Sequence, residues 1–169
     1  MPMRKSLFET NRLWFRQFIN EDKIHLFHLN SDEDVIRFTG DSAFDSVGQA
    51  SDFIDNYTHY RQYGFGRWAV ILKESNEFIG WCGLKYNPEV DEVDLGFRLF
   101  KKHWNKGYAT EAAQGCLNYG FTKLGLKRIV GRAMNENKAS IAVLLKLGMR
   151  YEKQLNFNGH QGSCYVIHK

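Results

Sequence analysis

The stretch FRLFKKHWNKGYATEAA, residues 97–113, decides the fold of this chain. An apolar strand is expected to end near Phe100, and a polar turn with Gly107 leads into a helix. The first N–H groups of a helix lack intrahelical partners and carry partial positive charge, so such a turn suits an anion. Gly107 leaves room for close approach of a phosphate, and Lys102 and Lys106 add cationic groups.

This turn has two interpretations on its own features, a pyrophosphate site or an ordinary strand-to-helix connection with solvated lysines. Spacing excludes two other nucleotide-binding patterns. GxxxxGK[ST] needs a glycine five residues before Gly107 and a lysine after it, whereas Lys106 precedes the glycine here. GxGxxG also fails across the turn. Nucleotide hydrolysis and hydride transfer therefore lose their main support.

Working outward, the chain alternates strand and helix patterns. Seven strands are predicted at residues 12–18, 68–74, 77–86, 93–100, 128–134, 150–157 and 163–168. Four helices are predicted at residues 20–30, 47–63, 109–124 and 137–147. Gly115 and Gly120 inside the third helix each cost about 1 kcal/mol relative to alanine, which indicates close packing of this helix on a sheet. The sum is an α+β fold with a mixed sheet.

Composition fits one folded domain over residues 1–169. With 43% hydrophobic residues the chain can build a core without disulfides or metal, and Cys82 and Cys116 are expected to be buried thiols. The net charge of +4 suits an anionic ligand but lacks the dense basic stripe of a nucleic-acid-binding protein. No stretch resembles a signal peptide or approaches the roughly 20 apolar residues of a membrane span. We therefore expect a cytoplasmic protein with no nucleic-acid or membrane partner.

WNKGYATEAA, residues 104–113, resembles the acetyl-CoA-binding motif of the GNAT superfamily of N-acetyltransferases, whose pattern is Gln/Arg-x-x-Gly-x-Gly/Ala. Other segments follow the order of the RimJ/RimL branch, the ribosomal-protein N-terminal acetyltransferases. These are ETNRLWFRQF (9–18), FGRWAVILKESNEFIGWCGLKY (65–86), VDLGFRL (93–99) and NKASIAVLLKLGMRY (137–151). The resemblance implies the GNAT fold, a three-layer arrangement with about seven mainly antiparallel strands and helices on both faces.

The resemblance also implies a set of cofactor contacts. Backbone amides of the turn would hold the CoA pyrophosphate, a role that falls on Asn105, Lys106, Gly107, Tyr108, Ala109 and Thr110. Trp104 occupies the Gln/Arg position. Asn105 replaces the glycine usual in this branch, so any left-handed backbone there would fall to asparagine, which tolerates it well.

Two further elements would contact the rest of the cofactor. The backbone of Phe97 and Leu99 would bond the amides of the pantetheine arm, and a nearby N–H would polarise the thioester carbonyl. Asn137 and Ser140 match helix positions on the other side of the cofactor. Asn137 could equally cap its own helix, and both roles stay open.

The reaction also requires a base that takes a proton from the amine and an acid that gives one to the CoA thiolate. Asp94 and Glu92, with Asp91, are the candidate general bases, and an ion pair of Asp94 with Arg98 or another cation is an equal alternative. Leu144 stands where many family members have a tyrosine acid, which leaves Ser140 as the candidate acid.

The expected reaction is transfer of an acetyl group from acetyl-CoA, as cosubstrate, to a primary amine by direct attack, without metal. The acceptor would be a protein N-terminus or a small amine, and nothing in the sequence selects between them or between monomer and homodimer. Trp81 is among the residues placed to meet it. The alternative is a catalytically silent sensor that only binds acyl-CoA.

Overall fold

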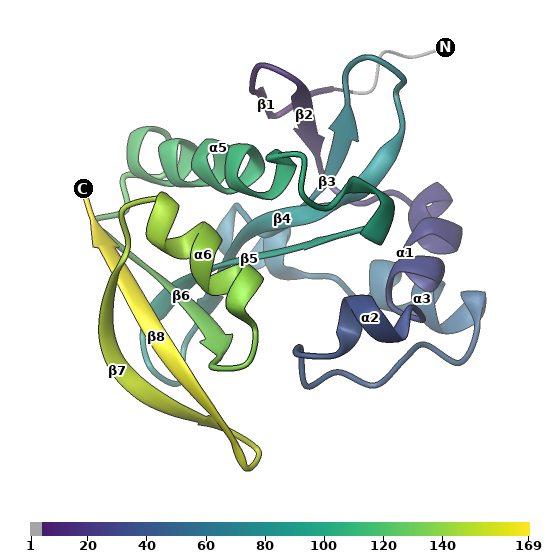
Figure 1. Cartoon of the computed structure of the whole chain (residues 1–169). Helices are drawn as coiled ribbons and strands as arrows, with labels where there is room; N and C mark the ends of the chain where they lie inside the picture. Colours follow the sequence, from purple (N-terminus) through teal and green to yellow (C-terminus); the bar gives the residue numbers. More distant parts are fainter. Residues whose placement is uncertain (1–4) are drawn as a thin grey trace.

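The computed structural model describes residues 5–169, and Figure 1 shows one twisted sheet with helices on both faces. The sheet order is β1-β2-β3-β4-β5-β6-β8-β7. The strands are β1 Phe8–Glu9, β2 Leu13–Arg16, β3 Arg67–Leu72, β4 Phe78–Asn87, β5 Glu92–Leu99, β6 Arg128–Met134, β7 Arg150–Phe157 and β8 His160–His168. The helices are η1 Asn20–Asp22, α1 Lys23–Leu29, α2 Glu33–Ile36, α3 Val47–Asp55, α4 His59–Tyr63, η2 Lys101–His103, α5 Tyr108–Thr122 and α6 Lys138–Lys146.

The sheet is mixed, as the sequence predicts. Its neighbouring strands pair antiparallel except β5 and β6, which are parallel and are connected through α5. The α+β class with helices on both faces is therefore confirmed. The sheet has eight strands where about seven are predicted, because the two-residue β1 carries too few residues for an alternating pattern.

Two apolar clusters fill the space between the layers. The larger packs α5 and α6 on one face of the sheet and includes Leu84, Leu117 and Leu144. The smaller lies on the opposite face, where α1 and α3 cover β2, β3 and β4. A Cβ at Gly120 would lie 2.9 Å from the Leu84 side chain, so this glycine lets α5 approach β4. Close packing of α5 on the sheet is confirmed.

The predicted helix over residues 47–63 is two helices. α3 ends at Asp55, where Asn56 Nδ2 donates to the Asp52 carbonyl at 2.9 Å. Two tyrosine hydroxyls at this break contact the same residue of β3. Tyr57 Oη, between the two helices, accepts from the Arg67 N–H at 2.7 Å, and Tyr60 Oη, in α4, donates to the Arg67 carbonyl. The break therefore serves the start of β3, a partner distant in sequence.

The cysteines are buried and unpaired. Cys82 and Cys116 are fully buried and their sulfur atoms lie 3.5 Å apart as free thiols, as expected of structural thiols. Burial in apolar surroundings raises the pKa of the Cys116 thiol. Among residues 5–169, no helix has the length and apolar character needed to cross a bilayer.

Candidate active site

The turn between β5 and α5 has an unusual backbone. Asn105 (φ 59°) and Gly107 (φ 80°) are both left-handed, separated by Lys106. The left-handed backbone at this position thus falls to Asn105, and asparagine is among the few residues that adopt it readily. Left-handed residues in a turn can direct successive N–H groups toward one concave surface that binds phosphates.

The start of α5 leaves N–H groups free. Gly107 is the N-cap and has no side chain to cap the helix, and the first helical bond runs from the Glu111 N–H to the Gly107 carbonyl at 3.0 Å. The N–H groups of Tyr108, Ala109 and Thr110 precede that bond and face out of the helix end. The helix is 15 residues long, so its dipole adds positive potential there.

Glu111 connects this helix end to the β1–β2 turn. Its Oε1 accepts from the Thr10 hydroxyl and the Arg12 N–H, both at 2.7 Å, and its Oε2 accepts from Arg12 Nε at 2.6 Å. Burial acts to raise the pKa of Glu111, but these three donors outweigh it and lower the pKa below its ordinary value. Sequence reasoning missed Arg12, because 99 residues separate it from Glu111 and no local pattern links them.

β5 presents backbone groups on the side away from β4. The Phe100 N–H donates to the Ile79 carbonyl at 3.0 Å. Hydrogen-bonded pairs alternate along an antiparallel ladder, so Arg98, two residues earlier, also bonds β4. The N–H and C=O groups of Phe97 and Leu99 therefore point toward β6.

β6 does not cover these groups. Its pairing with β5 involves Asp94 and Leu95 and, within the described residues, ends there. Figure 1 shows the two strands diverging beyond this point. The Leu99 carbonyl instead accepts from the Trp104 indole N–H at 2.9 Å. The N–H and C=O of Phe97 and the N–H of Leu99 are therefore available to hydrogen-bond a ligand that lies along the strand.

α6 begins beyond the end of β6. Asn137 is its N-cap, with Oδ1 accepting from the Ser140 N–H at 3.2 Å, so the capping role foreseen for Asn137 is confirmed. Ser140 is half-buried in the first turn of α6. Leu144 is buried against Gly131 of β6 and serves packing.

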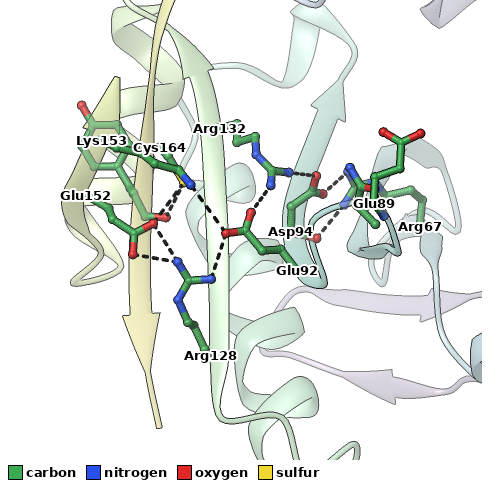
Figure 2. Close-up of polar contacts among 11 residues, drawn as sticks. Arg67, Glu89, Glu92, Asp94, Arg128, Arg132, Glu152, Lys153 and Cys164 are labelled. Carbon is green, nitrogen blue, oxygen red and sulfur yellow. Dashed lines mark hydrogen bonds and ion pairs between the residues drawn. The ribbon is translucent and has the colours of Figure 1, made fainter. Parts of the chain in front are cut away.

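Two of the candidate bases, Asp94 and Glu92, lie in a row of alternating charges that crosses the sheet (Figure 2). We call it the ion-pair chain; its members are Arg67, Asp94, Arg132, Glu92, Arg128 and Glu152. Asp94 accepts from Arg67 at 2.5 Å through Oδ1 and from Arg132 at 2.9 Å through Oδ2. Glu92 likewise pairs with Arg132 and, at 3.1 Å, with Arg128.

The ion pairs of Asp94 constrain how this carboxylate could act as a base. Both Asp94 oxygens accept charge-assisted hydrogen bonds, which are stronger than neutral ones. A base at this position would have to loosen one arginine as it takes a proton. Arg67 reaches Asp94 across Gly96, where a Cβ would lie 2.7 Å from the guanidinium carbon.

Arg98 is not the partner of Asp94. It donates to Asn30 Oδ1 at 2.6 Å and Asp41 Oδ2 at 2.7 Å. Its guanidinium lies 5.2 Å from the centre of the Trp81 ring, and that of Arg67 lies 5.4 Å from it. The sheet face opposite α5 thus carries an indole in contact with two cations.

The parallel pair of the central sheet thus diverges beside the start of α5. The family model for the acetyltransferase (GNAT) domain matches residues 12–150, and the chain belongs to this family. It is an N-acetyltransferase. An uncharacterized N-acetyltransferase of Bacillus licheniformis, p20, is 36% identical over 145 residues, covering 85% of this chain and 82% of that one.

Solved structures agree on the fold. A GNAT-family acetyltransferase from Bacillus anthracis has a TM-score of 0.82 at 29% identity, covering 95% of this chain and 96% of that one. Spermidine N-acetyltransferase from Vibrio cholerae, in complex with CoA and spermine, has a TM-score of 0.80, covering 93% and 95%. At 19% sequence identity, this likeness shows a shared fold only.

Proposed function

We propose that the chain binds acetyl-CoA with its pyrophosphate on residues 105–110 and its pantetheine arm along β5 at Phe97 and Leu99. The observation that carries the proposal is the left-handed turn at Asn105 and Gly107. It precedes a helix whose first N–H groups have no hydrogen-bond partner among residues 5–169. The unpaired groups of β5 continue from this turn. Together they offer a donor set for phosphates at one end and for amides at the other.

The acetyl group would pass to a primary amine by direct attack on the thioester carbonyl carbon. The new C–N bond forms as the C–S bond breaks, and the amine loses a proton while the CoA thiolate gains one. An α-amine of pKa about 7.8 costs about 1 kcal/mol to deprotonate at pH 7, whereas a lysine at about 10.4 costs about 4.6 kcal/mol. A peptide N-terminus needs little help, so water, Asp94 or Glu92 suffices as base. Ser140 is the proposed acid.

For the acceptor, we propose a protein N-terminus or a small amine, in keeping with the resemblance to the RimJ/RimL branch. Support comes from Trp104 at the branch's motif position and from the order of the four other segments. The Vibrio cholerae spermidine N-acetyltransferase, which shares the fold, is in complex with CoA and spermine, so polyamines belong in the set to be assayed. Fold likeness alone does not choose an acceptor.

The test has a binding arm and a turnover arm. CoA affinity would be measured by calorimetry, and thiol release from acetyl-CoA would be followed with a panel of peptides, amino acids and polyamines. We expect micromolar-range binding and release with at least one amine. Absence of CoA binding would refute the proposal, and binding without turnover on any amine would favour the sensor alternative.

Gly107 offers a matched pair of variants. Gly107→Ala places a Cβ 3.3 Å from Arg12 Nη2 and forces alanine into a left-handed backbone, at a cost of roughly 1–2 kcal/mol. Gly125→Ala carries the same backbone strain at φ 68° in open space. We expect about tenfold weaker CoA binding in the first variant and unchanged binding in the second. Equal affinities would place the pyrophosphate elsewhere.

A further inference from the structure

We propose that Arg12 is a positioning residue of the pyrophosphate site, which holds the turn against α5 and cancels the charge of Glu111 beside the ligand. The inference rests on the proposed acetyl-CoA function. It assigns a role to the β1–β2 turn, which lies outside the acetyl-CoA motif of residues 104–113.

The contacts of one guanidinium group support the first half of this role. Besides its bond to Glu111, Arg12 donates through Nη1 to the carbonyl of Lys106 at 3.0 Å. Its guanidinium carbon lies 4.3 Å from the centre of the Tyr108 ring. Lys106 belongs to the turn, Tyr108 begins α5 and Glu111 lies in its first turn. One planar side chain therefore fixes the turn and the helix start relative to each other.

The charge of Glu111 supports the second half. A carboxylate in the first turn of α5 suits the helix dipole, but it would repel a pyrophosphate bound at the same helix end. The lowered pKa keeps Glu111 ionised at neutral pH. Its side chain is 18% exposed, so water screens this charge only in part. The cation that neutralises it is Arg12.

Arg12 also faces the site. Its side chain is 40% exposed, and Nη2 lies near the position that a Cβ of Gly107 would take. Among the hydrogen bonds of residues 5–169, Nη2 donates to none, while Nε and Nη1 are both engaged. The Nη2 group of Arg12 is therefore available to donate a hydrogen bond beside the turn. Lysine could not replace the group, because a single ammonium lacks the planar fork that reaches Glu111 and Lys106 together.

The experiment measures CoA affinity by calorimetry for the wild type, Arg12→Gln, Arg12→Lys, Glu111→Gln and the double variant Arg12→Gln/Glu111→Gln. Arg37→Ala, which removes an arginine side chain that is 64% exposed, controls for net charge. We expect Arg12→Gln to weaken CoA binding about tenfold and Arg12→Lys to weaken it about threefold. Arg37→Ala should change it less than twofold.

The double variant separates charge cancellation from simple support. If Arg12 offsets the Glu111 charge, removing that charge restores affinity to within about threefold of the wild type. A double variant as weak as Arg12→Gln would overturn charge cancellation, and wild-type affinity in Arg12→Gln would overturn the whole inference. Thermal unfolding of each variant shows whether it is folded. If Arg12→Gln does not fold, the CoA affinities of Arg12→Lys and Glu111→Gln are compared with that of the wild type instead. Failure of the wild type to bind CoA would instead refute the proposed function.

Discussion

Asp94 occupies the point where the sheet pairing and the ion-pair chain cross. It is the first of the two β5 residues that pair with β6, and its side chain joins Arg67 of β3 to Arg132 of β6. Asp94 therefore holds these strands together, and we propose that it also serves as a general base. These two roles make different demands, since a base must release its partners and an ion pair must keep them.

Asp94→Asn tests the base role with little change in shape. Loss of a general base lowers turnover by roughly 10²–10⁴-fold, so we expect at least a hundredfold lower turnover and CoA affinity within threefold of the wild type. Rate profiles from pH 6 to 9 provide the measurement. Glu74→Gln, which removes an exposed carboxylate from the β3–β4 turn, is the control. Full activity of Asp94→Asn across this range would assign the proton to water or Glu92.

At the scale of elements, a buried ion pair joins β2 to the first helices. Arg16 and Asp22 form two parallel hydrogen bonds at 2.7 and 2.8 Å, and Asp22 also accepts from the Ile19 N–H at 2.9 Å. Both side chains are almost fully buried, at 6% and 3% exposure. Removing one partner leaves a buried, uncompensated charge on the other.

Asp22→Ala should accordingly lower the free energy of unfolding by about 3–5 kcal/mol. Glu9→Gln, which breaks the exposed pair with Lys73, should change it by less than about 1 kcal/mol. Urea unfolding followed by tryptophan fluorescence compares the two variants. Similar stabilities would mean that solvent compensates Arg16 and that this pair does not anchor the helices.

Elements with strong local patterns were predictable, and those that depend on distant partners were not. β6 and β7 have the predicted bounds, 128–134 and 150–157, and α5 begins one residue before its predicted start. The break between α3 and α4 is hidden because apolar spacing continues across it through Phe53, Tyr57 and Tyr60. The tyrosine hydroxyls that require the break bond the backbone of β3. The contact of Arg12 with Glu111 was likewise not predictable, because it joins residues that are distant in the sequence.

Across the whole molecule, carboxylates are held ionised by cations on neighbouring elements. A hydrogen bond from Lys102 lowers the pKa of Glu77, and one from Arg128 lowers that of Glu152. Burial acts to raise the pKa of Glu111, but hydrogen bonds from Arg12 and Thr10 outweigh it and lower this pKa. A carboxylate with a lowered pKa stabilises the fold above its ordinary value of 4.5, and this contribution is lost as the pH falls through the folded-state pKa.

The melting temperature should therefore be steady from pH 7 to 5 and fall below about pH 4.5. In the triple variant Glu77→Gln/Glu111→Gln/Glu152→Gln the fall should be shallower, because these groups no longer take up protons on unfolding in acid. Circular dichroism melting at half-unit pH steps measures both curves. Parallel curves would show that other groups control acid unfolding.

The divergence of β5 from β6 gives the sheet a short internal edge. Edge strands with free backbone groups invite pairing with strands of other chains. Here the edge spans only Phe97 to Leu99, and the Trp104 indole already occupies its last carbonyl. A foreign strand would find too few partners, whereas a slender ligand with amide groups would find enough. Such a ligand would complete the ladder, so the hydrogen bonds that align it for reaction would also protect the protein against aggregation through this strand.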